Sequence, residues 1–194
     1  MDPVLLTERL ALRPFTPSDV DNLLLLDGDA DVMRYIDGGA KTRAEIEETV
    51  LPRFLAYQAT YDHLGFLVGE TRSEGEFVGW FGVHPVTPTD DAMEFWPDSV
   101  DDVSVVSLGY RLRRGAWGHG YATEGARAVV RWAFGDPAVR SVVATTMSVN
   151  TGSRRVMEKV GLSYVRTVHV EWPDPLPGTE HGEVEYRLDR AARG

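Results

Sequence analysis

Three closely spaced glycines, Gly115, Gly118 and Gly120, occupy positions where backbone amides could bind a phosphate. Residues 103–112 before them are rich in β-branched and apolar side chains, as in a strand, and apolar side chains recur after them at helical spacing. In such a turn, bare N–H groups can converge on an anion at the helix N-terminus, where the helix dipole also favours negative charge. The pattern predicts a phosphate site; an ordinary glycine-rich turn is the alternative.

Two well-known phosphate loops do not fit this segment. A P-loop requires Gly-Lys followed by Ser or Thr, and the sequence contains no such triplet. A dinucleotide-binding fingerprint requires a third glycine three residues after the second, and the chain has Thr123 there. What remains is a Gly118-x-Gly120 pair followed by small residues in the first helical turn.

This loop resembles the acetyl-coenzyme A loop of the GNAT superfamily of N-acetyltransferases. Three further blocks, residues 6–14, 31–36 and 150–162, resemble the branch that includes the ribosomal-protein N-terminal acetyltransferases. The four blocks occur in the family order over nearly the whole chain. The chain is therefore identified as a member of this superfamily.

The resemblance implies an α/β fold, with a mixed, partly antiparallel central sheet flanked by helices, in one domain over residues 1–194. Two central strands would splay apart, and the pantetheine arm of acetyl-CoA would lie between them. The loop amides would hold the pyrophosphate, and the backbone N–H of Leu112 would face the thioester oxygen as an oxyanion donor. The cofactor-binding residues expected on this basis are Leu112, Arg113, Trp117, Gly118, His119, Gly120, Tyr121, Ala122, Thr123, Asn150 and Ser153.

Some of these roles have structural alternatives. The position of Asn150 also suits a cap of the following helix. Arg113 and its neighbours Arg111 and Arg114 could meet the cofactor phosphates, or they could be solvated charges at the end of a strand.

The acid and base of the reaction are not evident from the sequence. Many family members have a tyrosine on the last helix as proton donor, and this chain has Met157 there. A thiol pKa of about 8.5 makes a thiolate a tolerable leaving group without much protonation. The family often has a glutamate just before Gly-Tyr in the central strand, and here that position is Ser107, which could only position a water.

A site without a strong base is better suited to an amine of low pKa. An α-amine has a pKa of about 7.7–8.0 and a lysine side chain about 10.4, so far less free energy is needed to deprotonate the α-amine at pH 7. The expected acceptor is a protein or peptide N-terminal α-amine or a small-molecule amine. The acidic, aromatic residues 89–102 could attract such a cation, with Glu94 as the first candidate for a substrate-side acid; a solvated surface loop is the alternative.

The coarse element pattern is consistent with a mixed sheet. Helices are expected from Ser18 or Asp19 to about 27, at 42–62 with a kink or split at Pro52, from the loop to 134, and at 151–160 with a stop at Gly161. The expected strands cover about 8–14, 64–71, 76–84, 103–113, 140–149, 162–171 and 182–189.

Composition narrows the function further. The 194 residues, 43% of them hydrophobic, suffice for one core, and the net charge of −10 disfavours nucleic acid and anionic membranes but favours cationic partners. The chain has no cysteine, and its five histidines form no metal-ligand pair, so no metal site is expected. With no membrane-length apolar run and no leader, we expect a cytoplasmic protein. A homodimer is compatible with the pattern.

Two alternatives to an N-acetyltransferase remain. One is a non-catalytic acyl-CoA-binding or sensor module, and the other, which the sequence of the glycine loop disfavours, is another nucleotide-binding enzyme.

Overall fold

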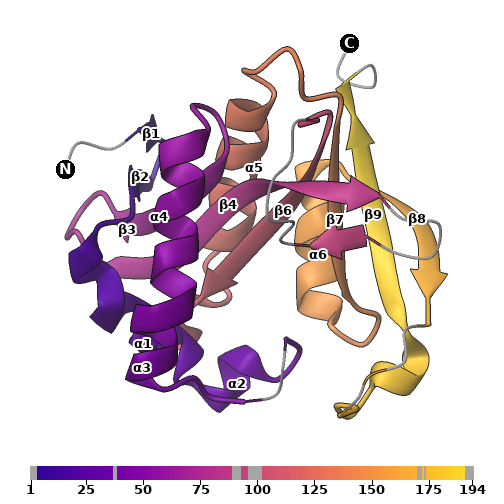
Figure 1. Ribbon diagram of the computed structural model, residues 1–194, viewed down its shortest axis with the longest axis horizontal. Coiled ribbons are helices and arrows are strands. Elements are labelled where there is room, and N and C mark those ends of the chain that lie inside the picture. The colour runs from indigo at the N-terminus through magenta and orange to yellow at the C-terminus, as the bar shows by residue number, and fades with distance from the viewer. Residues whose placement is uncertain are drawn as a thin grey trace.

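A mixed β-sheet runs through the computed structural model, which describes residues 4–36, 39–88, 93–95, 102–169, 172 and 174–190 (Figure 1). The strands pair in the order β1-β2-β3-β4-β6-β7-β9-β8, and β5 pairs with the far end of β4. Only the β6–β7 pairing is parallel among these strands; the other pairs are antiparallel. The strands are β1 (Leu5–Leu6), β2 (Leu10–Pro14), β3 (Gly65–Thr71), β4 (Phe77–Pro88), β5 (Met93–Phe95), β6 (Val105–Leu112), β7 (Ser141–Met147), β8 (Ser163–Val168) and β9 (Glu183–Asp189).

Helices cover both faces of this sheet. In Figure 1, α4 lies in front of the strands and α5 behind them. The α-helices are α1 (Val20–Asp27), α2 (Ala30–Met33), α3 (Arg43–Glu45), α4 (Leu51–Thr60), α5 (Tyr121–Ala133) and α6 (Thr151–Val160). Shorter turns are η1 (Pro17–Asp19), the π-helical η2 (Ile46–Val50), η3 (Arg114–Ala116) and η4 (Thr179–His181).

Each face of the sheet has its own hydrophobic core. On the α5 side, Phe81 and Val129 belong to a cluster that also takes in Leu108 and Leu112 of β6. On the opposite side, Phe54 of α4 stacks on Phe66 of β3, with ring centroids 4.0 Å apart. Because side chains alternate along a strand, β6 presents its even-numbered residues to α5 and its odd-numbered residues to the face covered by α1 and α4.

Most of the expected elements are present, with two differences. The helix expected over 42–62 consists of α3, the π-helical η2 and α4 in direct succession, and the backbone stays helical at Val50 and Leu51, so the helix is not split at Pro52. The π turn, in which Leu51 N–H bonds to Ile46 O, comes directly before the proline. The strand expected to end at residue 84 continues to Pro88, because its last residues pair with β5. His84 is therefore inside a strand, where it is buried, and not at the strand end.

A buried ion-pair network anchors the first helix to the sheet. Arg13 of β2 donates to both carboxylate oxygens of Asp19, at 2.7 and 2.9 Å, and also pairs with Glu70 of β3 at 2.8 Å. Burial alone would raise the pKa of Asp19, but hydrogen bonds from Arg13 and Thr16 outweigh it and hold that pKa below its usual value. The charged carboxylate therefore stabilises the folded state.

Replacement of this carboxylate should be among the most destabilising changes at the N-terminal end. Asp19→Ala leaves the charge of Arg13 without its buried partner, and we expect a loss of about 3–5 kcal/mol in the free energy of unfolding. Because the folded pKa is depressed, the contribution is present above about pH 4 and is lost as the pH falls through the folded pKa. Urea unfolding between pH 7 and 3 should therefore show a steeper pH dependence for the wild type than for the variant.

Asp21→Ala is the matched control. The Asp21 side chain is 82% exposed and pairs with Arg43 at the surface. Its loss should cost about 1 kcal/mol or less. Equal destabilisation by the two variants would contradict the role given to Asp19.

Candidate active site

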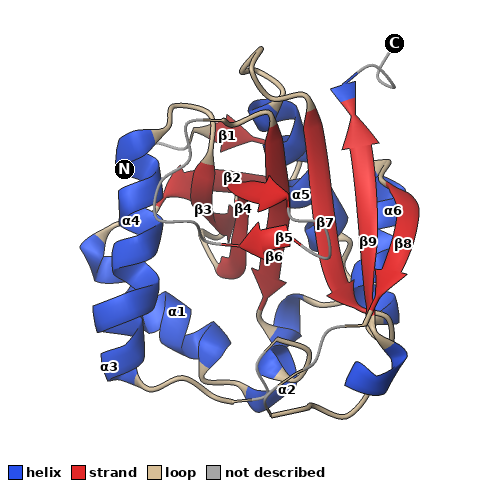
Figure 2. Cartoon of the chain, turned by 45° about the vertical axis from the view of Figure 1, so that its right-hand side comes forward, coloured by secondary structure: helices blue, strands red, loops and turns tan. Residues whose placement is uncertain are grey.

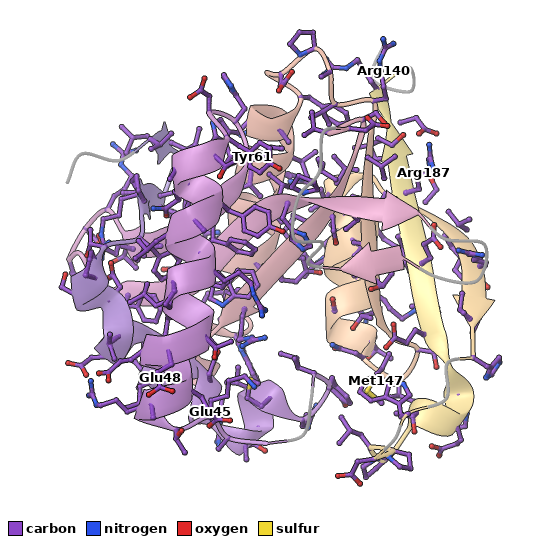
Figure 3. The ribbon with its side chains drawn as sticks, viewed as in Figure 1. Glu45, Glu48, Tyr61, Arg140, Met147 and Arg187 are labelled. Carbon is purple, nitrogen blue, oxygen red and sulfur yellow. The ribbon has the colours of Figure 1, made fainter. Side chains whose placement is uncertain are left out.

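Strands β6 and β7 separate soon after they begin. Their parallel pairing covers only Val105 to Ser107 of β6, opposite Ser141 to Val143 of β7. Beyond these residues the two arrows diverge toward their C-terminal ends in Figure 2. Figure 3 places Arg140, which precedes β7, and Met147, which ends it, at opposite ends of the strand, so the gap opens toward Met147.

The edge of β6 that faces this gap carries backbone groups that point away from β4. Arg113 N–H donates to Val78 O at 3.0 Å, and in an antiparallel ladder hydrogen-bonded and non-hydrogen-bonded pairs alternate. Leu112, opposite Gly79, therefore belongs to a non-hydrogen-bonded pair, and its N–H points away from β4. The same alternation turns the N–H group of Tyr110 to the gap, whereas that of Leu108, next to the Ser107–Val143 pair, lies where β7 still covers the edge. An extended ligand arm could pair with this edge as an additional strand would.

The glycine loop lies at the end of β6, immediately before α5. Gly118 and Gly120 have φ angles of +78° and +82°, in the left-handed region that glycine tolerates best. A Cβ atom at Gly118 would meet no atom within 4 Å, so this side of the loop faces open space. Trp117 connects the loop to the end of β6, because its Nε1–H donates a hydrogen bond of 2.7 Å to Leu112 O.

The N-terminus of α5 supplies the donors of this loop. Gly120 is the N-cap, and the first bond of the helix runs from Glu124 N–H to Gly120 O at 3.1 Å. Tyr121, Ala122 and Thr123 thus have N–H groups without an intrahelical acceptor, and glycine has no side chain to cap them. Three amides and the positive end of the helix dipole fit a diphosphate.

Comparison with known proteins places this geometry in a family. Residues 9–163 match the family described as acetyltransferase (GNAT) domain. The chain belongs to the GNAT acetyltransferase family. As a member of it, the chain is an acetyl-CoA-dependent N-acetyltransferase with acetyl-CoA as co-substrate.

Individual relatives and one solved structure match the chain over most of its length. An FsC-acetyl coenzyme A-N(2)-transacetylase of Aspergillus fumigatus is 36% identical over 97% of this chain and 77% of its own length. The uncharacterised protein YkkB of Bacillus subtilis is 30% identical over 89% of this chain and 91% of its own. A solved structure of the ribosomal-protein α-N-acetyltransferase RimL in complex with coenzyme A has the same fold. It has a TM-score of 0.74 and 17% identity, over 96% of this chain and 97% of that one.

The two residues expected from the last helix of the acetyltransferase have partners within the chain. Asn150 caps α6, because its Oδ1 accepts from Ser153 N–H at 3.2 Å. The hydroxyl of Ser153 lies 2.9 Å from that of Tyr110, which joins β6 to α6 on one side of the gap. Asn150 therefore has the capping role that its position suited, and its contact with the cofactor, like that of Ser153, stays a prediction.

The three arginines near the loop are paired with carboxylates. Arg113 pairs with Glu76, Arg114 with Asp31, and Arg111 with the buried Asp27 of α1. Arg111 is itself mostly buried, so it is not a solvated strand-end charge. The phosphate role expected for Arg113 stays a prediction, and it would require the side chain to exchange partners.

The face of β6 opposite α5 carries the expected acceptor side of the site. Ser107 is buried there and lies opposite His84 of β4. Burial lowers the pKa of His84 to about 4, so its imidazole is neutral at pH 7. Asp27 reaches the same face but is ion-paired with Arg111. Met157 lies in the core on the other side, and its thioether has no proton to donate.

Two further regions border the site. Glu94 lies in β5, opposite Thr87, but its side chain is outside the described residues, so its role stays a prediction. A hollow of about 550 Å³ lies on the segment between β8 and β9, lined mainly by Trp172, Pro175 and Leu176. Ser148, just after β7, donates to His181 O at 2.9 Å, which places this segment beside the open end of the gap.

The described residues contain neither a candidate metal cluster nor a helix of membrane-spanning character. Within these parts of the chain, no group of three or more His, Cys, Asp or Glu side chains could hold a metal ion. No helix there is long and apolar enough to cross a membrane.

Proposed function

We propose that this acetyltransferase acetylates an amine of low pKa by direct attack on acetyl-CoA in a ternary complex. The acceptor is a protein or peptide N-terminal α-amine or a small-molecule amine. The observation that carries this proposal is the acceptor face of β6, where Ser107 replaces a carboxylate and the neighbouring His84 is a weak base. An amine that is already partly deprotonated at pH 7 needs no stronger base.

The relatives give two precedents for such acceptors. The name of the Aspergillus protein specifies transfer to a nitrogen numbered 2 of FsC, and RimL is named for transfer to a protein α-amine. The hollow beside the open end of the gap, with its apolar lining, would suit the side chain of either kind of acceptor.

A thiol-release assay with acetyl-CoA and a panel of small amines and peptides tests the activity. We expect release above the spontaneous rate with at least one α-amine. Calorimetric binding of acetyl-CoA without any transfer would instead favour the acyl-CoA-binding or sensor alternative. An absence of binding would contradict both.

Glu94→Gln tests the substrate-side acid. If the Glu94 carboxylate attracts the cationic amine, the variant should raise the KM for the amine several-fold and leave the KM for acetyl-CoA unchanged. Steady-state kinetics with one amine at several acetyl-CoA concentrations separates the two constants. Unchanged kinetics would contradict a role for Glu94 in binding the amine.

The single domain, the cytoplasmic location and the homodimer also stay predictions. Limited proteolysis tests the first, cell fractionation the second, and light scattering of the pure protein the third.

A further inference from the structure

A carboxylate lies in the first turn of the helix that would hold the diphosphate. Glu124 lies four residues after Gly120, the N-cap of α5, and its side chain is only 16% exposed. Burial alone would raise its pKa, but hydrogen bonds from Thr7 and Arg9 outweigh this and lower it, so the group is ionised at pH 7. A negative charge at this point opposes the binding of a second anion. The site therefore requires a compensating cation.

Arg9, from the turn between β1 and β2, supplies that cation. Its guanidinium binds Glu124 Oε2 through Nε at 2.7 Å and through Nη2 at 2.6 Å. Its backbone N–H donates to Glu124 Oε1 at 2.8 Å. The carboxylate is thus neutralised by a residue more than one hundred positions away in the sequence.

The same guanidinium also contacts the loop itself. Nη1 donates to His119 O at 2.9 Å, and the group lies 4.7 Å from the ring centroid of Tyr121. A Cβ atom built on Gly120 would lie 3.4 Å from Nη2. These contacts fix a loop carbonyl and place positive charge beside the glycine that caps α5.

Two donors of Arg9 remain available on this side. A guanidinium has five N–H donors, and the contacts to Glu124 and His119 among the described residues use three of them. The side chain is 44% exposed, so the remaining N–H groups can reach a ligand in solvent. The other arginines near the loop have different partners: Arg111, Arg113 and Arg114 each pair with a carboxylate other than Glu124.

We propose that Arg9 is part of the diphosphate site: it cancels the charge of Glu124, holds the loop, and presents its remaining donors to the phosphates of coenzyme A. The inference rests on the acetyl-CoA loop described above. It adds a residue from the N-terminal turn that lies outside the glycine motif.

Arg9→Gln tests this role against a merely structural one. We expect the KM for acetyl-CoA to rise about tenfold, as for the loss of one charge-assisted contact, with kcat nearly unchanged. The KM for S-acetylpantetheine, which lacks the diphosphate, should not change. Equal KM values for acetyl-CoA in variant and wild type, or equal losses with the two thioesters, would overturn the proposal.

Two further variants allow the proposal to be tested if Arg9→Gln folds poorly. Arg9→Lys retains the charge and should lose less affinity for acetyl-CoA than Arg9→Gln. Arg9→Gln with Glu124→Gln removes both charges and should recover part of the loss. No recovery, together with a lysine variant as weak as the glutamine one, would contradict charge compensation.

Arg72→Gln is the matched control for the turn. Arg72 Nη1 donates to Thr7 O at 2.7 Å and to Glu8 O at 3.2 Å, which stabilises the same turn, and within the described residues these side-chain hydrogen bonds do not involve Glu124 or the glycine loop. It should affect thermal stability without raising the KM for acetyl-CoA. Failure of the wild type to bind coenzyme A in calorimetry would contradict the proposed function itself. Normal wild-type binding with an unaffected Arg9→Gln variant would contradict only the role of Arg9.

Discussion

Gly118→Val should lower kcat/KM for acetyl-CoA by about 100-fold or more while the protein still folds. Gly118 has a φ of +78°, where a residue with a Cβ costs about 1–2 kcal/mol. A Cβ at this position would meet no protein atom within 4 Å, so the valine side chain would project into the open space beside the loop that is expected to hold the diphosphate. The diphosphate would then be displaced from the helix N-terminus, and the thioester with it.

Gly75→Val gives the matched control for this variant. Gly75, in the turn between β3 and β4, has a φ of +69°, and a Cβ there also meets no atom within 4 Å. Both variants should therefore lose similar stability, about 2–4 °C in Tm per kcal/mol. Only Gly118→Val should lose binding of coenzyme A in calorimetry. If both variants bind coenzyme A as the wild type does, the loop is an ordinary turn.

The local features of this site could be predicted from the sequence. The glycine loop before α5 and the stop of α6 at Gly161 depend on neighbouring residues and on backbone conformations that favour glycine. The Asn150 cap is also local, because its side chain reaches an amide three residues away. The family resemblance supplied the splayed strands, which no local pattern indicates.

The long-range features could not be predicted in this way. Arg9 and Glu124 are brought together by the fold, and nothing in their own neighbourhoods signals the pair. The pairing of Arg111 with Asp27 likewise depends on how α1 packs against β6. The sequence predicts a strand that ends at His84, but the pairing of the last residues of β4 with β5 continues it to Pro88. Each of these features depends on contacts that the neighbouring residues in the sequence do not reveal.

The second large effect is expected for the ratio of kcat/KM between an α-amine acceptor and a lysine acceptor. At pH 7 the free-base fraction of an α-amine with a pKa of about 7.7–8.0 exceeds that of a lysine side chain with a pKa of about 10.4 by roughly 230–420-fold. If no group of the enzyme removes the proton, this ratio passes directly into kcat/KM. Two peptides of one sequence measure it: one has a free N-terminus and an acetylated lysine, and the other an acetylated N-terminus and a free lysine. The peptide with the free N-terminus should react hundreds of times faster, and the KM for acetyl-CoA should be the same with both.

The pH dependence separates this cause from selective binding. Below the pKa of the amine, kcat/KM should rise tenfold per pH unit, and it should level off near pH 8 for the α-amine but continue to rise to about pH 10 for lysine. The preference should therefore shrink to a few tens-fold at pH 9. His84, with a pKa of about 4, stays neutral over this whole range and adds no step to the profile. A preference that does not change with pH would place the selectivity in acceptor contacts, and faster reaction at lysine would contradict the proposed acceptor class. A plateau below pH 7 would reveal a general base that Ser107 does not provide.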